Sequence, residues 1–179
     1  MSFATVTIKD KTFKPLINSK KLATAVARMA GAINQELASQ FPVFLVVLNG
    51  SFMFAADLLK GVNVPCEISF VKLASYSGTS SSGSVKELLG LDSDISKRTV
   101  VIVEDIVDSG LTIETLCQQL NSRNAGNIKV ATLLFKPASY KRKENPDYVG
   151  FEIGEEFVVG YGMDYDGQGR NLKEVYVSA

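Results

Sequence analysis

Residues 100–112 of this 179-residue chain read VVIVEDIVDSGLT, and this stretch decides the fold. Its first four residues are apolar and β-branched, which predicts a strand buried on both faces. The polarity then changes abruptly, with carboxylates at Glu104, Asp105 and Asp108. Small residues follow, and apolar residues at helical spacing from Leu111 to Leu120 predict a helix. A strand, a short turn and a helix in this order indicate an α/β sheet.

The turn before this helix is a candidate anion site. Backbone N–H groups and the helix dipole point at such a turn, so residues 108–112 are expected to hold a phosphate. Three carboxylates would repel a phosphate, and they are expected to face sugar hydroxyls, a divalent cation or a transferable proton. A phosphorylated ribose with Mg²⁺ would satisfy all of these groups. For each residue taken alone, an Asp N-cap at Asp108 and a glycine turn that merely start the helix stay an open alternative. The turn matches neither a Walker A loop nor Gly-x-Gly-x-x-Gly.

Composition excludes several classes of protein. Lys and Arg together number 19, Asp and Glu also number 19, and there is no histidine. Catalytic triads with histidine and His-ligated metal sites therefore cannot be built from this chain. The net charge of +0 argues against a broad nucleic-acid-binding surface. The longest apolar run, 41–48, is too short to cross a bilayer, and no secretory signal is visible, so we expect a cytoplasmic protein without a membrane partner.

Strand and helix patterns alternate along the whole chain. Strands are predicted at 3–9, 43–48, 66–74, 100–103, 128–135, 157–161 and 175–177, and helices at 19–37, 52–59 and 111–120. This order predicts a single domain, 1–179, of the α/β class, with a mostly parallel central sheet flanked by helices on both faces. The Ser- and Gly-rich residues 75–84 break every periodicity and are expected to form a flexible lid.

Four further residues are candidates for a structural or functional role. Gly50 follows an apolar strand and would let the backbone approach a ligand closely, while Ser51 is expected to cap the next helix. Lys136 ends another apolar strand, where α/β sheets gather ligand contacts, although an ordinary surface lysine is an equally good interpretation. Arg170 ends a loop rich in Gly and Asp.

Residues 104–112 resemble the diphosphoribose-binding motif of type I phosphoribosyltransferases. Further pieces resemble one branch, the hypoxanthine-guanine phosphoribosyltransferases, and their order and spacing match over nearly the whole chain. These pieces are LNGSF at 48–52, Ser75-Tyr76, Lys136-Pro137, and FVVGY at 157–161 with Asp164 and Arg170. The resemblance implies the type I fold, in which the chain termini form a small hood over the sheet.

The resemblance also implies a role for each candidate residue. Glu104 and Asp105 would accept hydrogen bonds from the ribose hydroxyls, directly or through Mg²⁺. Asp108 would be the catalytic residue, acting as general base and acid at purine N7, with Ser109, Gly110, Leu111 and Thr112 beside it around the 5′-phosphate. Pyrophosphate would be held by Leu48, Asn49, Gly50 and Arg170, and the purine by Ile106, Lys136, Phe157, Val158 and Asp164. The implied metal ligands are Glu104, Asp105 and Asp164, and the implied lid residues are Ser75 and Tyr76.

The implied reaction transfers a phosphoribosyl group from phosphoribosyl diphosphate to N9 of hypoxanthine or guanine, giving IMP or GMP and pyrophosphate. The resemblance also implies a homodimer or homotetramer. An ammonium at Lys136 donates but cannot accept, so adenine should be a poor substrate. Asn49 departs from the Lys or Arg that is common there, which removes a possible cation from the pyrophosphate site, and the peptide before it can be cis in this family. Two alternatives stay open: a nucleotide-sensing, RNA-binding regulator, and a transferase for xanthine, adenine or a pyrimidine.

Overall fold

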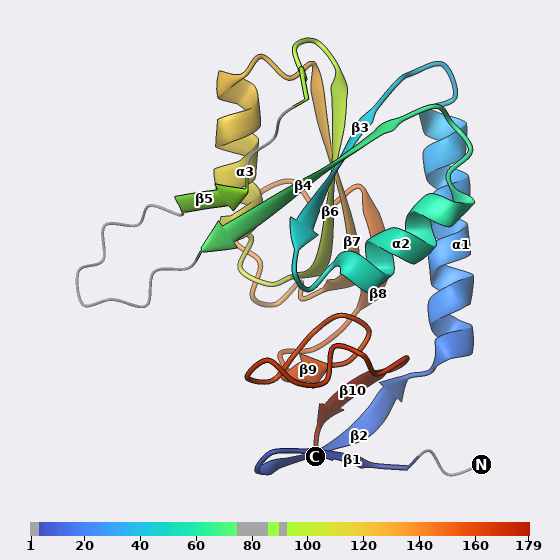
Figure 1. Ribbon diagram of the computed structural model, residues 1–179, viewed down its shortest axis with the longest axis vertical. Helices are drawn as coiled ribbons and strands as arrows, with labels where there is room; N and C mark the ends of the chain where they lie inside the picture. The colour runs from blue at the N-terminus through green and yellow to red at the C-terminus, as the bar shows by residue number, and fades with distance from the viewer. Residues whose placement is uncertain (1–3, 75–85, 90–92) are drawn as a thin grey trace.

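The computed structural model describes residues 4–74, 86–89 and 93–179. Its centre is a six-stranded sheet with the order β5-β4-β3-β6-β7-β8 (Figure 1). The strands are β3 (Val43–Leu48), β4 (Glu67–Ala74), β5 (Lys86–Leu89), β6 (Thr99–Val107), β7 (Asn127–Phe135) and β8 (Tyr148–Glu152). Neighbouring strands from β4 to β8 run parallel, and β5 pairs with β4 antiparallel. The predicted α/β class with a mostly parallel sheet is confirmed.

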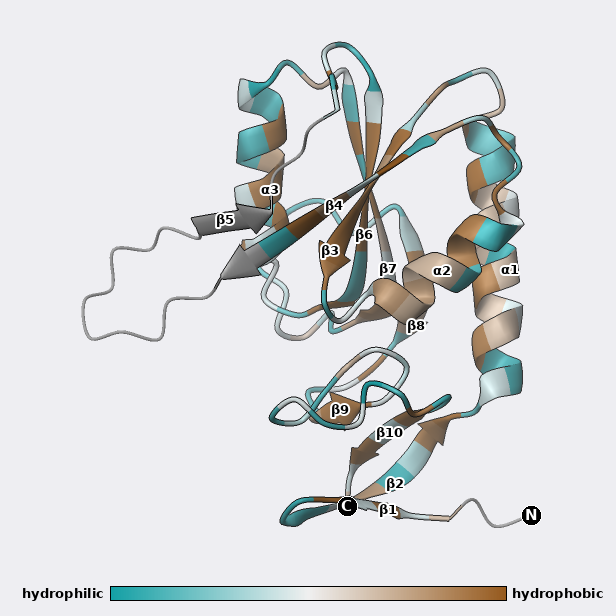
Figure 2. Ribbon diagram, in the orientation of Figure 1, coloured by the Kyte–Doolittle hydropathy of each residue, from teal (hydrophilic) through white to brown (hydrophobic). Residues whose placement is uncertain are grey.

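Helices cover both faces of this sheet. Helices α1 (Ser19–Glu36) and α2 (Phe52–Gly61) pack on one face, and α3 (Leu111–Ser122) packs on the other. Strand β3 shows why the sequence folds this way: Phe44 and Val46 point towards α1 and α2, whereas Val43 and Leu45 point towards α3. Because side chains alternate along a strand, a strand buried on both faces must be apolar throughout. The hydrophobic colouring of β3 in Figure 2 follows from this burial.

A second, four-stranded sheet is built from both ends of the chain, as the resemblance implied. It contains β1 (Val6–Ile8), β2 (Lys11–Ile17), β9 (Val158–Val159) and β10 (Val175–Ser178), in the order β1-β2-β10-β9. This hood lies next to the ends towards which β3 and β6 run (Figure 1). Phe13, Val159 and Tyr176 form its own small apolar cluster.

The structure adds three strands that the sequence patterns did not predict, β2, β5 and β8. The predicted edge strand at 3–9 is described as β1, over Val6–Ile8. The predicted lid at 75–84 lies outside the described residues. Within the described ranges, no helix combines the length and apolar character that a bilayer crossing requires.

Candidate active site

The carboxyl ends of β3, β6 and β7 meet at one edge of the large sheet, and the hood lies beside that edge. In parallel α/β sheets this is the edge at which ligands bind, because the loops that leave neighbouring strands converge there. The candidate residues predicted from the sequence lie in these loops, at the end of β6 and in the facing hood loop 157–170.

The two adjacent carboxylates of β6 have different surroundings. Strand β6 continues to Val107, so Glu104 and Asp105 lie inside it rather than after its end, and successive side chains of a strand point to opposite faces. Burial raises the pKa of Asp105 to about 6, although backbone N–H groups and, more weakly, the Arg170 guanidinium favour its charged form. Burial and the charge of Asp105 raise the pKa of Glu104. Glu104 Oε2 is buried and has no hydrogen-bond partner within the described part of the chain.

These buried carboxyl groups fit a cation that binds together with a ligand. No three acidic, Cys or His side chains of the described residues gather closely enough to hold a metal by themselves. Mg²⁺ commonly binds through one or two carboxylates and completes its shell with water and substrate oxygens. Glu104, Asp105 and Asp164 supply the hard oxygen atoms that such an ion prefers. These residues therefore fit Mg²⁺ bound together with a phosphorylated substrate.

The buried charge of Asp105 should reduce the stability of the ligand-free protein. The difference between a folded-state pKa of about 6 and the usual 3.8 corresponds to a cost of about 3 kcal/mol once the group is ionised. Because the folded state binds this proton more tightly than the unfolded state does, the stability of the protein falls as pH rises from about 4 to about 6. Asp105→Asn is expected to raise the urea midpoint of ligand-free protein at pH 8 and to change it little at pH 4. A lower midpoint at pH 8 would contradict this account.

The turn after β6 presents unpaired N–H groups. Gly110 is the N-cap of α3 in a left-handed conformation, with φ of +85°, and no side chain caps the helix. The alternative in which Asp108 merely caps the helix is therefore wrong. The Asp108 side chain is 51% exposed, and the N–H groups of Ser109 and Gly110 have no hydrogen-bond acceptor among the described residues. The first turn of α3 therefore offers free donors to an anion.

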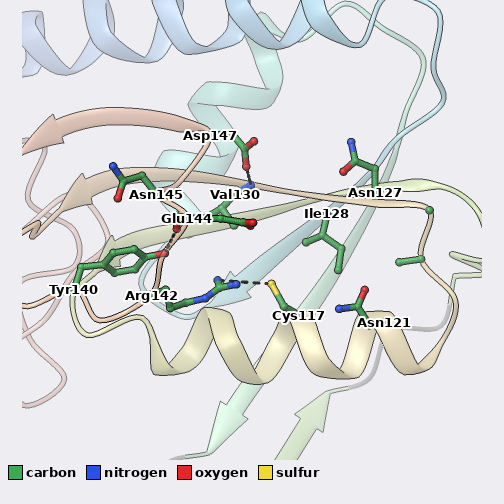
Figure 3. A pocket seen from close by; sticks show the side chains of 12 residues that line it. Cys117, Asn121, Asn127, Ile128, Val130, Tyr140, Arg142, Glu144, Asn145 and Asp147 are labelled. Atoms are coloured by element: carbon green, nitrogen blue, oxygen red, sulfur yellow. Dashed lines mark hydrogen bonds between the residues drawn. The ribbon is translucent and has the colours of Figure 1, made fainter.

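The side chains of Tyr140 and Arg142 pack against this turn at Gly110. A Cβ atom at Gly110 would lie 2.7 Å from Cε2 of Tyr140 and 3.2 Å from Cδ of Arg142, so glycine is required by space as well as by φ. Tyr140 donates to the Glu144 carbonyl oxygen at 2.7 Å, and Arg142 reaches Cys117 Sγ at 3.8 Å (Figure 3). These side chains also line a polar cavity of about 290 Å³ beside α3.

The loop after β3 contacts the end of β6. The Leu48–Asn49 peptide bond is cis, which the sequence alone could not show. A Cβ atom at Gly50 would collide with the Asp105 carboxylate, so the close backbone approach predicted at Gly50 is present, although towards Asp105. Ser51 occupies the predicted N-cap position of α2. Its hydroxyl, however, donates to the Val47 carbonyl oxygen and makes no hydrogen bond to the first turn of the helix, so capping by the side chain is wrong.

A cavity of about 270 Å³ opens between the sheet edge and the hood. It is lined by Asp105, Ile106, Asp108, Lys136, Phe157, Val158, Met163 and Asp164. All five residues predicted to bind a purine lie on its wall. Met163 was not predicted, because a methionine in a loop has no recognisable pattern.

Lys136 and Asp108 converge inside this cavity. Lys136 is only 7% exposed, and its backbone N–H donates to the Val107 carbonyl oxygen at 2.9 Å, which fixes the residue directly beyond β7. Its Nζ lies 3.3 Å from Asp108 Oδ2 and 3.4 Å from the Glu155 carbonyl oxygen. The interpretation of Lys136 as an ordinary surface lysine is therefore wrong.

The Phe157 ring supplies an apolar surface to the same cavity. This ring is 46% exposed and is supported by other hood side chains. The ring centroids of Phe13 and Tyr165 lie 6.3 Å and 5.9 Å from it, and Lys11 Nζ lies 5.7 Å from its centroid. A supported ring with an exposed part can stack on a flat aromatic ligand.

Arg170, at the end of the hood loop, forms an ion pair with Asp164 of the same loop. Arg170 Nη2 lies 2.6 Å from Asp164 Oδ1, and Arg170 Nη1 donates to the Gly162 carbonyl oxygen at 2.8 Å. The Gly167 N–H donates to Asp164 Oδ2 at 2.7 Å. The structure therefore brings the predicted phosphate, pyrophosphate and purine residues to one edge. Ser75 and Tyr76 lie outside the described residues.

Comparisons with known proteins agree with this arrangement. Residues 15–166 match the family model "Phosphoribosyl transferase domain". The chain is 39% identical to a hypoxanthine-guanine phosphoribosyltransferase of Bacillus subtilis (strain 168), covering 95% of each chain, and 41% identical to one of Mycobacterium bovis, covering 89% of this chain and 83% of that protein.

Solved structures give the same result. A hypoxanthine-guanine phosphoribosyltransferase from Bacillus anthracis superposes with a TM-score of 0.86 at 36% identity, covering 93% of this chain and 96% of that one. A hypoxanthine phosphoribosyl transferase from Trypanosoma cruzi gives a TM-score of 0.87 at 33% identity, covering 97% and 95%. The chain therefore belongs to the phosphoribosyltransferase family, and the relatives that match it over most of their length are named hypoxanthine-guanine or hypoxanthine phosphoribosyltransferases.

Proposed function

We propose that this protein is a purine-salvage enzyme that transfers the phosphoribosyl group of phosphoribosyl diphosphate to N9 of hypoxanthine or guanine. The products are IMP or GMP and pyrophosphate. The observation that carries this proposal is the cavity of about 270 Å³ in which Lys136, Asp108 and Phe157 meet. The named relatives support the same reaction.

The cavity matches one edge of a 6-oxopurine. N7 and the 6-oxygen lie on the same edge of the base, and the Asp108 carboxylate and the Lys136 ammonium lie 3.3 Å apart on the cavity wall. Lys136 would donate to the 6-oxygen, and Asp108 would accept a proton at N7 as N9 attacks the sugar. Adenine has an amino group at this position, so two donors would face each other. Phe157 would stack on the ring.

The phosphoribosyl end would lie across the neighbouring loops. The free N–H groups at Ser109 and Gly110 would bind the 5′-phosphate, and Asp105 and Glu104 would bind the ribose side and Mg²⁺. When bound, Mg²⁺ would stabilise the negative charge that develops on the leaving pyrophosphate. Arg170 would donate hydrogen bonds to the same group, and its pairing with Asp164 holds it at the cavity edge.

A spectrophotometric assay tests the proposal directly. Purified protein is given phosphoribosyl diphosphate and Mg²⁺ with hypoxanthine, guanine, xanthine or adenine, and each reaction is repeated with EDTA. We expect turnover of 6-oxopurines that EDTA abolishes, and little turnover of adenine. Failure with every base, for folded protein, would contradict the proposal. The alternative of an RNA-binding regulator has no support from the relatives reported above, whose names are those of enzymes.

We also propose that the protein forms a homodimer or a homotetramer. Ile68 and Phe70 lie two residues apart on β4, so their side chains share one face, and they are 48% and 45% exposed. Neighbouring exposed apolar side chains commonly mark an interface. Because phosphorylated substrates and products do not cross membranes freely, we further propose that the enzyme acts in the cytoplasm.

Phe70→Lys should weaken self-association, because the new charge would have to be buried in the interface. We expect sedimentation velocity to show a shift towards monomer of at least about 10-fold in the dissociation constant. Leu16→Lys is a matched control, since Leu16 is an exposed apolar residue of the hood, 38% exposed. An unchanged assembly in Phe70→Lys would exclude this strip as the interface.

A further inference from the structure

The turn 160–162 holds two distant parts of the active site together. Gly160, Tyr161 and Gly162 all have positive φ, of +93°, +49° and +106°. A tyrosine rarely adopts this conformation, and such a residue persists only where its surroundings enforce it. Tyr161 is only 5% exposed, and its N–H donates to the Leu172 carbonyl oxygen at 2.7 Å.

The Tyr161 side chain connects this turn to α2. Its hydroxyl donates to Asp57 Oδ2 at 2.6 Å, across 104 positions of sequence. The other oxygen of Asp57 accepts from Lys60 Nζ at 2.8 Å, which fixes the carboxylate on the helix surface. Helix α2 begins directly after the loop 49–51, so the hydrogen bond joins the hood turn to the element that carries that loop.

The residue after Tyr161 contacts both halves of the proposed pyrophosphate site. A Cβ atom at Gly162 would collide with the Gly50 carbonyl oxygen, so the two backbones are in close contact. The Gly162 carbonyl oxygen accepts from Arg170 Nη1 at 2.8 Å. The position of this turn therefore sets the distance between Gly50, on one side of the site, and Arg170, on the other.

We propose that Tyr161 and Asp57 are positioning residues for the diphosphate end of phosphoribosyl diphosphate. Neither side chain lines the purine cavity. Their hydrogen bond holds the turn 160–162 against Gly50. This turn also holds Arg170, and with it Asp164, at the edge of the site. This role rests on the proposed function, because it assigns the ligand of that site.

Tyr161→Phe keeps the ring and removes only the hydroxyl. We expect KM for phosphoribosyl diphosphate to rise about 10-fold, the effect of losing one hydrogen bond to a charged acceptor, with KM for hypoxanthine and kcat at saturation within about 2-fold of wild type. Steady-state kinetics with each substrate varied in turn gives this split. A purely structural role would not separate the two KM values.

Tyr148→Phe is a matched control. Tyr148 also donates to a carboxylate at 2.6 Å, that of Glu36. It is 6% exposed and lies at the start of β8, at the opposite edge of the sheet from the active site. Both variants are expected to lower Tm by a similar amount, and only Tyr161→Phe should raise KM for phosphoribosyl diphosphate.

Variants of Asp57 test the hydrogen-bond partner of Tyr161. Asp57→Ala should raise KM for phosphoribosyl diphosphate as Tyr161→Phe does. Asp57→Asn should retain most of the affinity for this substrate, because an acceptor oxygen remains. The double variant Tyr161→Phe/Asp57→Ala should have a KM no higher than that of either single variant. Wild-type protein without turnover would refute the proposed function and this assignment with it. Active wild type with an unchanged KM in Tyr161→Phe, or an equal rise in both KM values, would refute only the positioning role.

Discussion

Asp108→Asn is expected to lower kcat by about 10²–10⁴-fold, the usual range for loss of a general acid–base group. Asparagine is nearly the same size, so the turn and the donors at Ser109 and Gly110 should remain. The dissociation constant for phosphoribosyl diphosphate with Mg²⁺ should therefore change by no more than about 3-fold. Single-turnover kinetics gives the rate of the chemical step, and calorimetry gives the dissociation constant.

The control for Asp108→Asn concerns its contact with Lys136. Loss of the carboxylate also leaves the buried ammonium without its partner at 3.3 Å. KM for hypoxanthine is therefore measured as well, since a displaced lysine would raise it, whereas loss of proton transfer alone would not. An unchanged rate of the chemical step would remove Asp108 from the acid–base role.

The central unit of the fold was predictable because its signals are local. The apolar run at 100–103, the acidic turn and the helix after Gly110 adjoin one another in sequence, and β6 and α3 appear where they were expected. The predicted strand was too short, however. Because the polar residues Glu104 and Asp105 continue β6, the polarity change does not mark its end.

The hood was less predictable because long-range pairing stabilises it. Strand β2 contains Pro15, which usually argues against a strand interior, and it lies between β1 and the C-terminal β10. No local pattern predicts a partner more than 150 residues away. The hairpin turn before β2 uses Lys9 with φ of +51°, where Asn-Gly would have been the recognisable signal.

The same distinction applies to the site. Lys136 could be identified because it directly follows an apolar strand, and Asp108 because it lies in the turn between an apolar strand and a helix. Asp57 could not, because an acidic residue on an exposed helix surface looks like any solvated carboxylate. Its contact with Tyr161 becomes visible only when α2 and the hood turn are placed side by side.

Lys136→Gln is expected to lower kcat/KM for hypoxanthine and guanine by about 10²-fold, the effect of losing a charged hydrogen bond to a buried acceptor. A glutamine amide can also accept a hydrogen bond, so the ratio of adenine to hypoxanthine turnover should rise. Binding of phosphoribosyl diphosphate with Mg²⁺ should stay within about 3-fold of wild type, because Lys136 faces the purine end of the cavity. Competition assays with both bases measure the ratio.

Lys129→Gln is the matched control for Lys136→Gln. It shows which effects come from losing any partly buried lysine and not from losing recognition of the base. Lys129 lies near the other end of β7, with its Nζ 2.8 Å from Glu36 and 2.9 Å from Asp147. This variant should lower Tm and leave the choice of base unchanged, since its charge lies at the opposite edge of the sheet. Equal losses in purine use and in phosphoribosyl diphosphate binding for Lys136→Gln would mean that Lys136 supports the fold of the site. A loss confined to 6-oxopurines would mean that its ammonium selects the base.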